Sequence, residues 1–444
     1  METKKASKNI IWIFGDQHRA QAMGHRGDSN VHTPNMDRLS VEGINFTQAV
    51  GGCPLCCPFR GSLLSGLYPN KAVHGHEIQL DPKFPTVATV FNEAGYDTAY
   101  FGKWHLDGYV QRGNPRADHH IIPPERRGGF KTWMGYDNNN SQWDCWIHGG
   151  EGDEAFHYKL PGYETDALTD LFIDDLKKKG EAGSPFFSVL SVQPPHNPYA
   201  APEEFMGMHN AAELELRPNV PDIPRVTEQA RRDLAGYYAM IENFDWNIGR
   251  IRQALDDAGL TEDTLILFFS DHGDMHGSHG QFLKTSPWEE SIRVPCILAG
   301  GIPYRDSGSG QFNIPMNHVD YAPTSLGLCG IEVPDWMMGT DYSPLRFKQQ
   351  PAEPYPESAY LQLVTPTCHG YSTDRPWRGV VTRDGWKYIV LEGQPWMMFN
   401  LNEDPYEQAN LAHNSVFWKD RKRLHSLLEE WVEKTDDNFL LPTE

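Results

Sequence analysis

Short apolar segments are the feature of this sequence that most restricts its fold. Four of them lie at 9–14 (NIIWIF), 96–101, 185–192 and 264–269 (TLILFF). They have the length and the near-continuous apolar character of strands that are covered on both faces. Helical stretches lie between them, most clearly at 166–179 and 226–258. This alternation predicts an α/β fold with a large, mostly parallel central sheet flanked by helices.

Two of these strands are followed by adjacent polar residues. Asp16 and Gln17 follow the first strand, and Asp271 and His272 follow the strand at 264–269. Open α/β sheets bind ligands at the carboxyl ends of their strands, so the four side chains converge if the two strands are parallel neighbours. Oxygen donors with one imidazole suit a divalent cation; we expect Ca²⁺, with Mn²⁺ or Zn²⁺ also compatible. The simpler alternative is that Asp16 only caps a turn.

The stretch 51–66, GGCPLCCPFRGSLLSG, combines three cysteines with an arginine and leads into a predicted helix. Pro58 suits the first helical position, which places Cys56 at or just before the helix N-terminus. A thiol is acidified there, and Arg60 adds a fork of donors suited to a tetrahedral oxyanion. Alternatively, Cys53 and Cys56 have the C-x-x-C spacing of a redox pair or half of a zinc site, although no second such pair follows. A third interpretation is a buried turn packed with small sulfur side chains.

Further titratable residues follow two other predicted strands. Lys103 and His105 lie two residues apart at the end of the strand at 96–101, so they project to the same side. His196 follows the strand at 185–192, in a loop that its prolines hold extended. A lone Lys or His on a loop is usually solvated, but a Lys-x-His pair after a buried strand is a stronger indication of a site.

The segment 107–163 shows neither helical nor strand periodicity. It is rich in Trp, His, Asn, Gly and Arg, and its aromatic residues argue against disorder. We predict a pocket wall that suits a sugar or aryl group, with Trp143, Trp146 and His148 as candidate contacts. A structural loop with its own apolar cluster is an equal alternative. His276 and His279 are further candidates for lining the pocket.

Composition excludes several classes of function. The net charge of -21 argues against nucleic-acid partners and against broad contact with anionic membranes. Seven unevenly spaced cysteines do not form a disulfide scaffold. No apolar run approaches the roughly 20 residues of a membrane span, and the N-terminal run is too short for a signal peptide. The chain is expected to be cytoplasmic as written, or periplasmic or secreted if a leader has been removed.

The last hundred residues differ in texture from the rest. A polar, proline-rich stretch at 349–356 precedes predicted strands at 379–382, 386–391 and 396–401, and then a helix at 417–434. We therefore expect two units: a catalytic α/β domain at 1–348, and a C-terminal subdomain at 349–444 with a small antiparallel sheet and a packed helix.

Several motifs together resemble the type I, formylglycine-dependent sulfatases of the alkaline phosphatase superfamily. The resemblance is carried by Cys56-Cys57-Pro58-Phe59-Arg60 with Leu64-Ser65-Gly66, by Gly102-Lys103-Trp104-His105, by Pro195-His196-Asn197-Pro198, and by the segment around Lys284. It extends over nearly the whole chain in the family's order. Phe59 departs from the family's usual small residue.

The resemblance implies an alkaline phosphatase-like fold and the hydrolysis of a sulfate monoester. A formylglycine-generating enzyme would oxidise Cys56 to formylglycine, which would be the nucleophile and contact the metal. The other implied roles are metal binding by Asp16, Gln17, Asp271 and His272; binding of the nucleophile and sulfate by Arg60 and Lys103; proton transfer at the formylglycine by His105; and contact with the leaving-group oxygen by His196 and Lys284.

Two alternatives to a saccharide sulfatase remain. The pair Asp16-Gln17, in place of Asp-Asp, also resembles phosphonate monoester and phosphodiester hydrolases and the choline sulfatases. A non-catalytic carbohydrate-binding relative would lack the nucleophile or a metal ligand, and neither is missing here. The substrate is expected to be a sulfated small molecule or saccharide, and the aromatic, polar segment at 107–163 favours a sugar.

Overall fold

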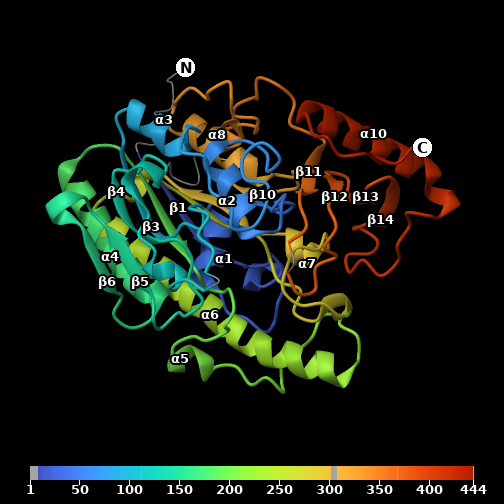
Figure 1. The fold of residues 1–444 in the computed structure, drawn as a ribbon, viewed down its shortest axis with the longest axis horizontal. Helices are drawn as coiled ribbons and strands as arrows, with labels where there is room; N and C mark the ends of the chain where they lie inside the picture. The colour runs from blue at the N-terminus through green and yellow to red at the C-terminus, as the bar shows by residue number, and fades with distance from the viewer. Residues whose placement is uncertain (1–8, 112, 302–307, 368, 444) are drawn as a thin grey trace.

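The computed structural model describes residues 9–111, 113–301, 308–367 and 369–443. Its main sheet has ten strands in the order β10-β2-β9-β8-β1-β7-β3-β4-β5-β6 (Figure 1). The predicted α/β architecture is confirmed. The strands are β1 (Asn9–Gly15), β2 (Ile44–Phe46), β3 (Asp97–Lys103), β4 (Thr132–Tyr136), β5 (Trp146–Gly149), β6 (Phe156–Lys159), β7 (Phe186–Val192), β8 (Thr264–Ser270), β9 (Cys296–Gly300) and β10 (Gly310–Phe312).

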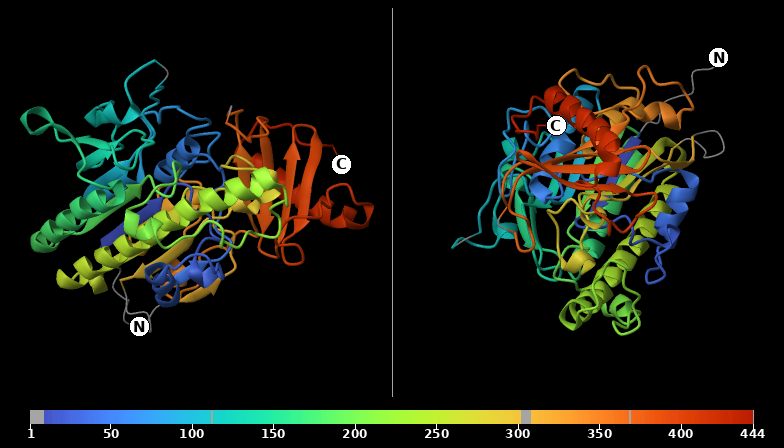
Figure 2. Two further views of the ribbon diagram at one scale, coloured as in Figure 1. Left: turned by 90° about the horizontal axis from the view of Figure 1, so that it is seen from below. Right: turned by 90° about the vertical axis from the view of Figure 1, so that its right-hand side faces the viewer.

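Helices cover both faces of this sheet. On one face α4 (Glu164–Ala182) and α6 (Pro224–Asp257) lie side by side, with α1 (Pro34–Glu42) against α6 (Figure 2). On the other face α2, α3 and α8 pack together. The remaining helices are α2 (Cys56–Ser65), α3 (Val87–Glu93), α5 (Glu203–Met206), α7 (Glu289–Ile292), α8 (Tyr321–Leu328), α9 (Ser343–Arg346) and α10 (Trp418–Lys434).

Strand β1 shows why the central strands are apolar throughout. Trp12 and Phe14 belong to the core on the face of α2, α3 and α8, whereas Ile11 and Ile13 belong to the core on the face of α4 and α6. Since successive side chains of a strand point to opposite faces, burial of both faces requires an apolar residue at nearly every position.

The four central strands β3, β7, β1 and β8 are parallel neighbours. Gly15 at the end of β1 is paired with Val192 of β7 and with Ser270 of β8. The carboxyl ends of these strands therefore meet at one edge of the sheet, which is where this architecture binds ligands.

A second, antiparallel sheet of four strands lies at one end of the molecule with α10 against it (Figures 1 and 2). Its strands are β11 (Ser358–Leu363), β12 (Trp377–Thr382), β13 (Trp386–Leu391) and β14 (Gln394–Asn400). The sheet and helix agree with the expected C-terminal architecture, and β11 is an additional strand. The boundary between 348 and 349 stays a prediction, because one apolar core joins Val50, Leu55 and Ile292 to Leu361 and Trp377 of the small sheet.

The prediction of an irregular segment at 107–163 was wrong in part. This segment contributes β4, β5 and β6, which extend the main sheet beyond β3. These strands have only four or five residues each, so their alternation is too brief to stand out from the surrounding glycines and polar residues.

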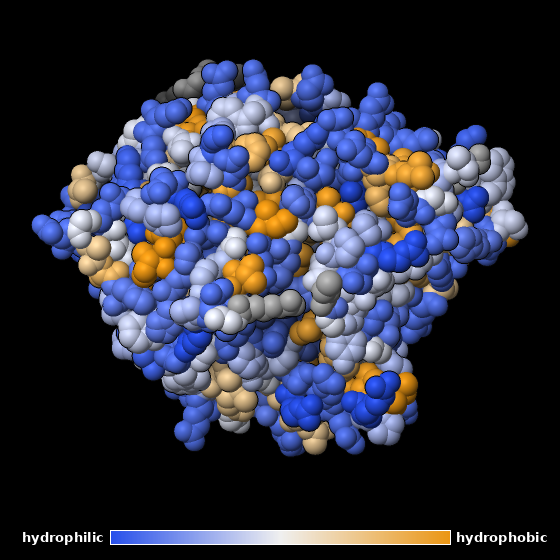
Figure 3. Space-filling model, viewed as in Figure 1, coloured by the Kyte–Doolittle hydropathy of each residue, from blue (hydrophilic) through white to orange (hydrophobic). Residues whose placement is uncertain are grey.

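The surface is mostly hydrophilic on the face shown in Figure 3, with scattered hydrophobic patches. Among the described residues, no helix is both long and apolar enough to cross a membrane.

Candidate active site

The carboxyl ends of the central strands bring the predicted metal ligands together. Asp16 follows β1 and Asp271 and His272 follow β8, while Cys56 begins α2. Ligand atoms of Asp16, Cys56, Asp271 and His272 all lie within 4.8 Å of one another, and all four side chains are buried. A Cβ at Gly51 would lie 2.1 Å from the Asp271 carbonyl oxygen, so glycine lets the loop before α2 approach this cluster.

Cys56 is surrounded by charged and titratable groups. Its Sγ lies 3.2 Å from His272 Nε2 and 3.5 Å from Asp16 Oδ1, and Lys284 Nζ donates to it at 3.2 Å. Leu55 is the N-cap of α2, so Cys56 lies at the helix N-terminus as predicted, although Pro58 is the third helical residue and not the first. Cys53 is outside the cluster and is a free thiol, so the C-x-x-C interpretation as a disulfide or zinc half-site is not supported.

Two buried cations hold Asp16 in its charged form. Lys103 Nζ donates to Asp16 Oδ2 at 2.6 Å, and Arg60 Nη2 donates to the same oxygen at 3.3 Å. Burial alone would raise the pKa of Asp16, but Lys103 and Lys284 lower it well below its usual range. The second terminal nitrogen of the Arg60 guanidinium, Nη1, donates to the Lys103 carbonyl oxygen and to Ser191 Oγ, which fixes the orientation of the group.

The oxygen atoms around Asp16 fit a divalent cation. Burial and the neighbouring Asp16 raise the pKa of Asp271, which shows the cost of holding two carboxylates together without a cation between them. Asp271 Oδ2 and Gln17 Oε1 are buried without a hydrogen-bond partner. Gln17 Nε2 donates to Asp274 Oδ2 at 2.6 Å, so the amide oxygen of Gln17 is the atom that could bind a cation. Unsatisfied buried oxygens beside two carboxylates and an imidazole are what a hard or borderline metal ion requires.

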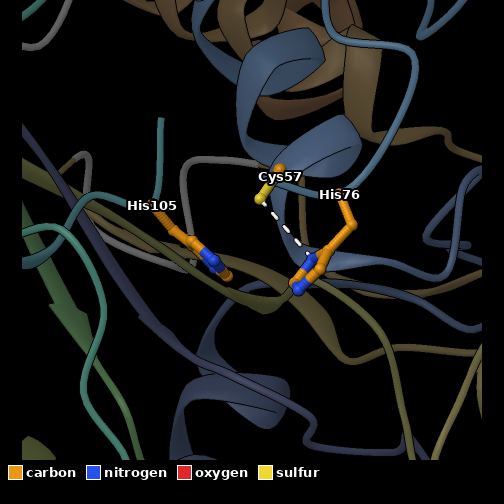
Figure 4. Close-up of side chains that lie close together, drawn as sticks. All are labelled: Cys57, His76 and His105. Carbon is orange, nitrogen blue, oxygen red and sulfur yellow. Dashed lines mark hydrogen bonds between the residues drawn. The ribbon is translucent and has the colours of Figure 1, made fainter. Parts of the chain in front are cut away.

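His105 lies beside Cys57 and beside His76, which the sequence did not single out (Figure 4). Its ring packs edge-on against His76 at 5.4 Å, and Cys57 Sγ lies 3.9 Å from His76 Nδ1. Burial and the nearby Lys103 lower the pKa of His105 well below its usual value, so its ring is neutral and able to accept a proton. His369, from the loop between β11 and β12, packs against His76 at 4.8 Å. Lone histidines on distant loops gave no sequence signal for this contact.

His196 is partly exposed at the end of β7. Its Nδ1 donates to the Asn197 carbonyl oxygen at 2.7 Å, which leaves Nε2 as the unprotonated nitrogen of the neutral ring. Burial and the positive charge of Lys284 lower the pKa of His196 well below its usual value. Gln142, which was not predicted, donates to the His196 carbonyl oxygen at 3.0 Å and so ties the segment 107–163 to this loop.

The candidate contacts in that segment have different environments. Trp143 is exposed and packs against Tyr163 at 5.2 Å. Trp146 lies on β5 and contacts His119 and His157. His148 is buried, and its Nε2 accepts a hydrogen bond from the Ile122 backbone, which is a structural contact. None of the three belongs to the cluster around Cys56, so their substrate role stays a prediction.

His276 and His279 also lie outside the cluster. His276 is buried against the rings of Tyr199 and Tyr237, and neither of its ring nitrogens has a hydrogen-bond partner. His279 stacks on Trp288, and its Nε2 contacts Asn219. Neither histidine contacts the cluster, so their role in substrate binding stays a prediction.

The carboxyl edge of the sheet thus gathers two buried cations, a possible metal-binding group and the Cys56 thiol. This combination is typical of enzymes that hydrolyse esters of tetrahedral oxyanions. The Sulfatase family model matches residues 8–331, and the model for the C-terminal region of N-sulphoglucosamine sulphohydrolase matches residues 277–434. The chain therefore belongs to the sulfatase family and is a sulfuric ester hydrolase.

Named relatives cover almost all of the chain. The ulvan-active sulfatase of Formosa agariphila is 34% identical over 97% of this chain and 82% of its own length. The N-acetylglucosamine-6-O-sulfatase of Bacteroides thetaiotaomicron is 26% identical over 98% of this chain and 88% of its own length. The crystal structure of a putative sulfatase, yidJ, from Bacteroides fragilis has a TM-score of 0.85 at 26% identity, with 99% of this chain and 98% of that one covered.

Proposed function

We propose that this protein hydrolyses a sulfate monoester on a saccharide, through a formylglycine made from Cys56 by a formylglycine-generating enzyme. The observation that carries the proposal is the position of Cys56 Sγ, within 3.5 Å of Asp16, His272 and Lys284 in a buried cluster. Relatives named for N-acetylglucosamine-6-O-sulfate and for ulvan support a saccharide as the substrate.

The residues of the cluster divide into an anion-binding set and a metal-binding set. Asp16, Gln17, Asp271 and His272 would hold a divalent cation, which when bound polarises the sulfate oxygens and favours the ionised nucleophile. The hydrate of formylglycine at position 56 would supply the attacking hydroxyl. Arg60 and Lys103, which both contact Asp16, would stabilise the negative charge of the sulfate.

His105 is suited to accept a proton at the nucleophile. It is held neutral by burial and by Lys103, as a general base must be before it acts. We propose that His105 takes the proton of the second hydroxyl of the hydrate, which releases sulfate and restores the aldehyde.

Lys284 is the better proton donor to the leaving group. Burial would lower its pKa, but the Cys56 sulfur and the carboxylates of Asp16 and Asp271 raise it. The two carboxylates remain when Cys56 becomes formylglycine, so we propose that the ammonium stays protonated. His196 presents an unprotonated Nε2 and has a lowered pKa, so it donates a proton only after a substrate anion has raised that pKa. Lys284 therefore protonates or stabilises the departing alkoxide, with His196 as a hydrogen-bonding partner.

Replacing Lys284 with alanine is expected to affect substrates according to their leaving group. For a sugar sulfate, whose alkoxide is a poor leaving group, kcat/KM should fall by roughly 10²- to 10⁴-fold. For 4-nitrophenyl sulfate, whose leaving group needs no proton, the fall should be less than about tenfold. Steady-state kinetics on both substrates checks this. Equal losses on both would contradict the proton-donor role of Lys284.

The alternative activity on phosphonate monoesters is favoured by the pair Asp16-Gln17. If the sulfatase proposal holds, kcat/KM for a sugar sulfate or aryl sulfate should exceed that for the corresponding phosphonate monoester by more than about tenfold, a difference of about 1.4 kcal/mol in transition-state binding. Initial rates on both esters with one enzyme preparation measure this ratio. A ratio below one would make the phosphonate activity the main one.

A further inference from the structure

A cavity lies beside the small sheet and is lined by none of the residues assigned to the reaction. It has a volume of about 340 Å³, within the range of small-molecule sites. Its lining comes from the loops after β1, β2 and β10, the loop before α6, both ends of α7, and the loops beside β13 and β14. We call it the arginine pocket, after Arg26, Arg217 and Arg293.

The arginine pocket shares its edge of the main sheet with the active site. Strand β2 is antiparallel to β9, which is antiparallel to β8, so β2 runs in the direction of β8 and its carboxyl end points the same way. Thr47, directly after β2, lines the pocket. Lys284 contacts Cys56 and Arg293 lines the pocket, so the segment between them connects the two sites in the chain. This segment contains α7, which is labelled in Figure 1.

The positive charge of the pocket exceeds its negative charge. Among the described residues that line it, Glu289 is the only carboxylate, and it already accepts hydrogen bonds from Arg293 Nε and Lys387 Nζ. Arg217 is paired with Glu290. Arg26 forms no ion pair with a described carboxylate, and desolvation and the neighbouring Arg293 lower its pKa. An anion would relieve the repulsion between these two guanidinium groups.

Polar atoms in the pocket wall lack partners. Arg293 is buried, and its Nη1 has no hydrogen-bond partner. The side-chain oxygens of Gln21 and Gln48 are likewise buried and unpaired. Buried polar groups are normally satisfied by protein, water or ligand, so Arg293 Nη1 is an unused donor in the wall of the pocket, and the two amide oxygens are unused acceptors.

An aromatic ring completes the site. Tyr406 lies at the pocket with Arg217 over its face, 5.0 Å from the ring centroid. Amide side chains of Asn313 and Asn402 also line the cavity. A ring that can pack against a sugar, amides for hydroxyl groups, and guanidinium groups for sulfate or carboxylate together match an anionic sugar unit.

A second cavity of about 300 Å³ adjoins the arginine pocket and extends it. The two share Gln21, Arg26, Arg217 and Tyr406. Its own carboxylates are engaged, since Asp28 accepts from Tyr238 and Glu215 accepts from Ser29. The combined groove therefore suits an extended ligand better than a single small anion.

We propose that the arginine pocket binds a sulfated sugar unit of a saccharide chain at a distance from the sulfate that is hydrolysed. The proposal rests on the proposed saccharide substrate. The protein would then distinguish saccharides by the positions of their sulfate groups. A sulfated unit in the pocket would contribute to binding of the saccharide but would not be hydrolysed.

The test uses a heparin-derived octasaccharide as the sulfated probe and a dextran octasaccharide as the uncharged one. Binding is measured by titration calorimetry with the full chain carrying Cys56→Ala, so that turnover cannot interfere. Arg26→Ala should raise the Kd for the sulfated probe by about 5- to 30-fold, and Tyr406→Ala should raise it by about 3- to 10-fold. The dextran probe should not bind. The matched control is Arg232→Ala, an exposed arginine of α6 outside the pocket, which should change the Kd less than twofold.

Two results would overturn the proposal: no binding of the sulfated probe, or unchanged binding by both pocket variants. Turnover of 4-nitrophenyl sulfate by Arg26→Ala in the otherwise native chain should equal that of the native protein. A fall in this turnover as large as the loss of probe binding would show damage to the active site instead. Probe binding without hydrolysis of any sulfate ester would refute the proposed function and leave the pocket standing. Sulfatase activity with unaltered binding in the variants would refute the pocket alone.

Discussion

Cys56→Ala is expected to lower kcat/KM for an aryl sulfate by about 10⁴-fold or more, because it removes the atom that becomes the nucleophile. Mass spectrometry of the tryptic peptide containing residue 56 should show an aldehyde in the native chain expressed with a formylglycine-generating enzyme. The same peptide should carry an unmodified thiol when that enzyme is absent, and activity should be lost with it.

The matched control for Cys56 is Cys53→Ala. Cys53 is buried in the same loop but lies outside the metal cluster, so its loss should change kcat/KM less than about threefold. Full activity with an unmodified thiol at position 56 would rule out the formylglycine mechanism and return Cys56 to thiolate chemistry.

Asp16→Asn is expected to remove both the metal and the activity. Asp16 contacts Lys103, Arg60 and the Cys56 thiol, so its charge links the metal-binding and anion-binding sets. The bound metal, measured by plasma mass spectrometry, should fall from about one ion per chain to less than about 0.1 ion per chain. The value of kcat/KM should fall by about 10³-fold or more.

The same substitution should lower stability in the metal-free protein. Without the carboxylate, Lys103 and Arg60 lose their shared buried counter-ion, which costs about 3–5 kcal/mol when one partner of a buried pair is removed. Denaturant unfolding measures this, and the assays should be run where the variant is folded. Asp341→Asn, which alters a carboxylate in the turn before α9, is the control and should keep its metal. Retention of one metal ion by Asp16→Asn would place the metal site elsewhere.

The sequence predicted the centre of the site because the relevant residues are attached to unmistakable strands. β1 and β8 are buried on both faces, so their apolar runs are continuous and the polar residues that end them stand out. The parallel pairing of these strands then makes Asp16 and Asp271 neighbours although 255 positions separate them in the chain.

The parts that could not be predicted depend on long-range contacts between individually ordinary residues. The histidines at 76 and 369 come from separate loops and meet where the small sheet packs against the loop before α2. Arg26 and Arg217 lie in polar loops without a motif, whereas Arg293 is buried just before β9, and no periodicity relates the three. Strands β4 to β6 were missed for a different reason. Their sequences are too short to specify a strand, and they become strands through pairing with their neighbours in the sheet.

The core shared by the two sheets has a consequence for the order of events during synthesis. Leu55 and Cys53, directly before Cys56, are covered by residues of β11 and β12 that the ribosome adds about three hundred positions later, and Cys56 itself is only 1% exposed. A maturation enzyme that converts Cys56 must therefore reach it while the chain is still growing or before the small sheet docks. The rate of translation and the folding of the C-terminal strands would then limit the time available for modification. After folding, residue 56 would keep the side chain that it had at that point.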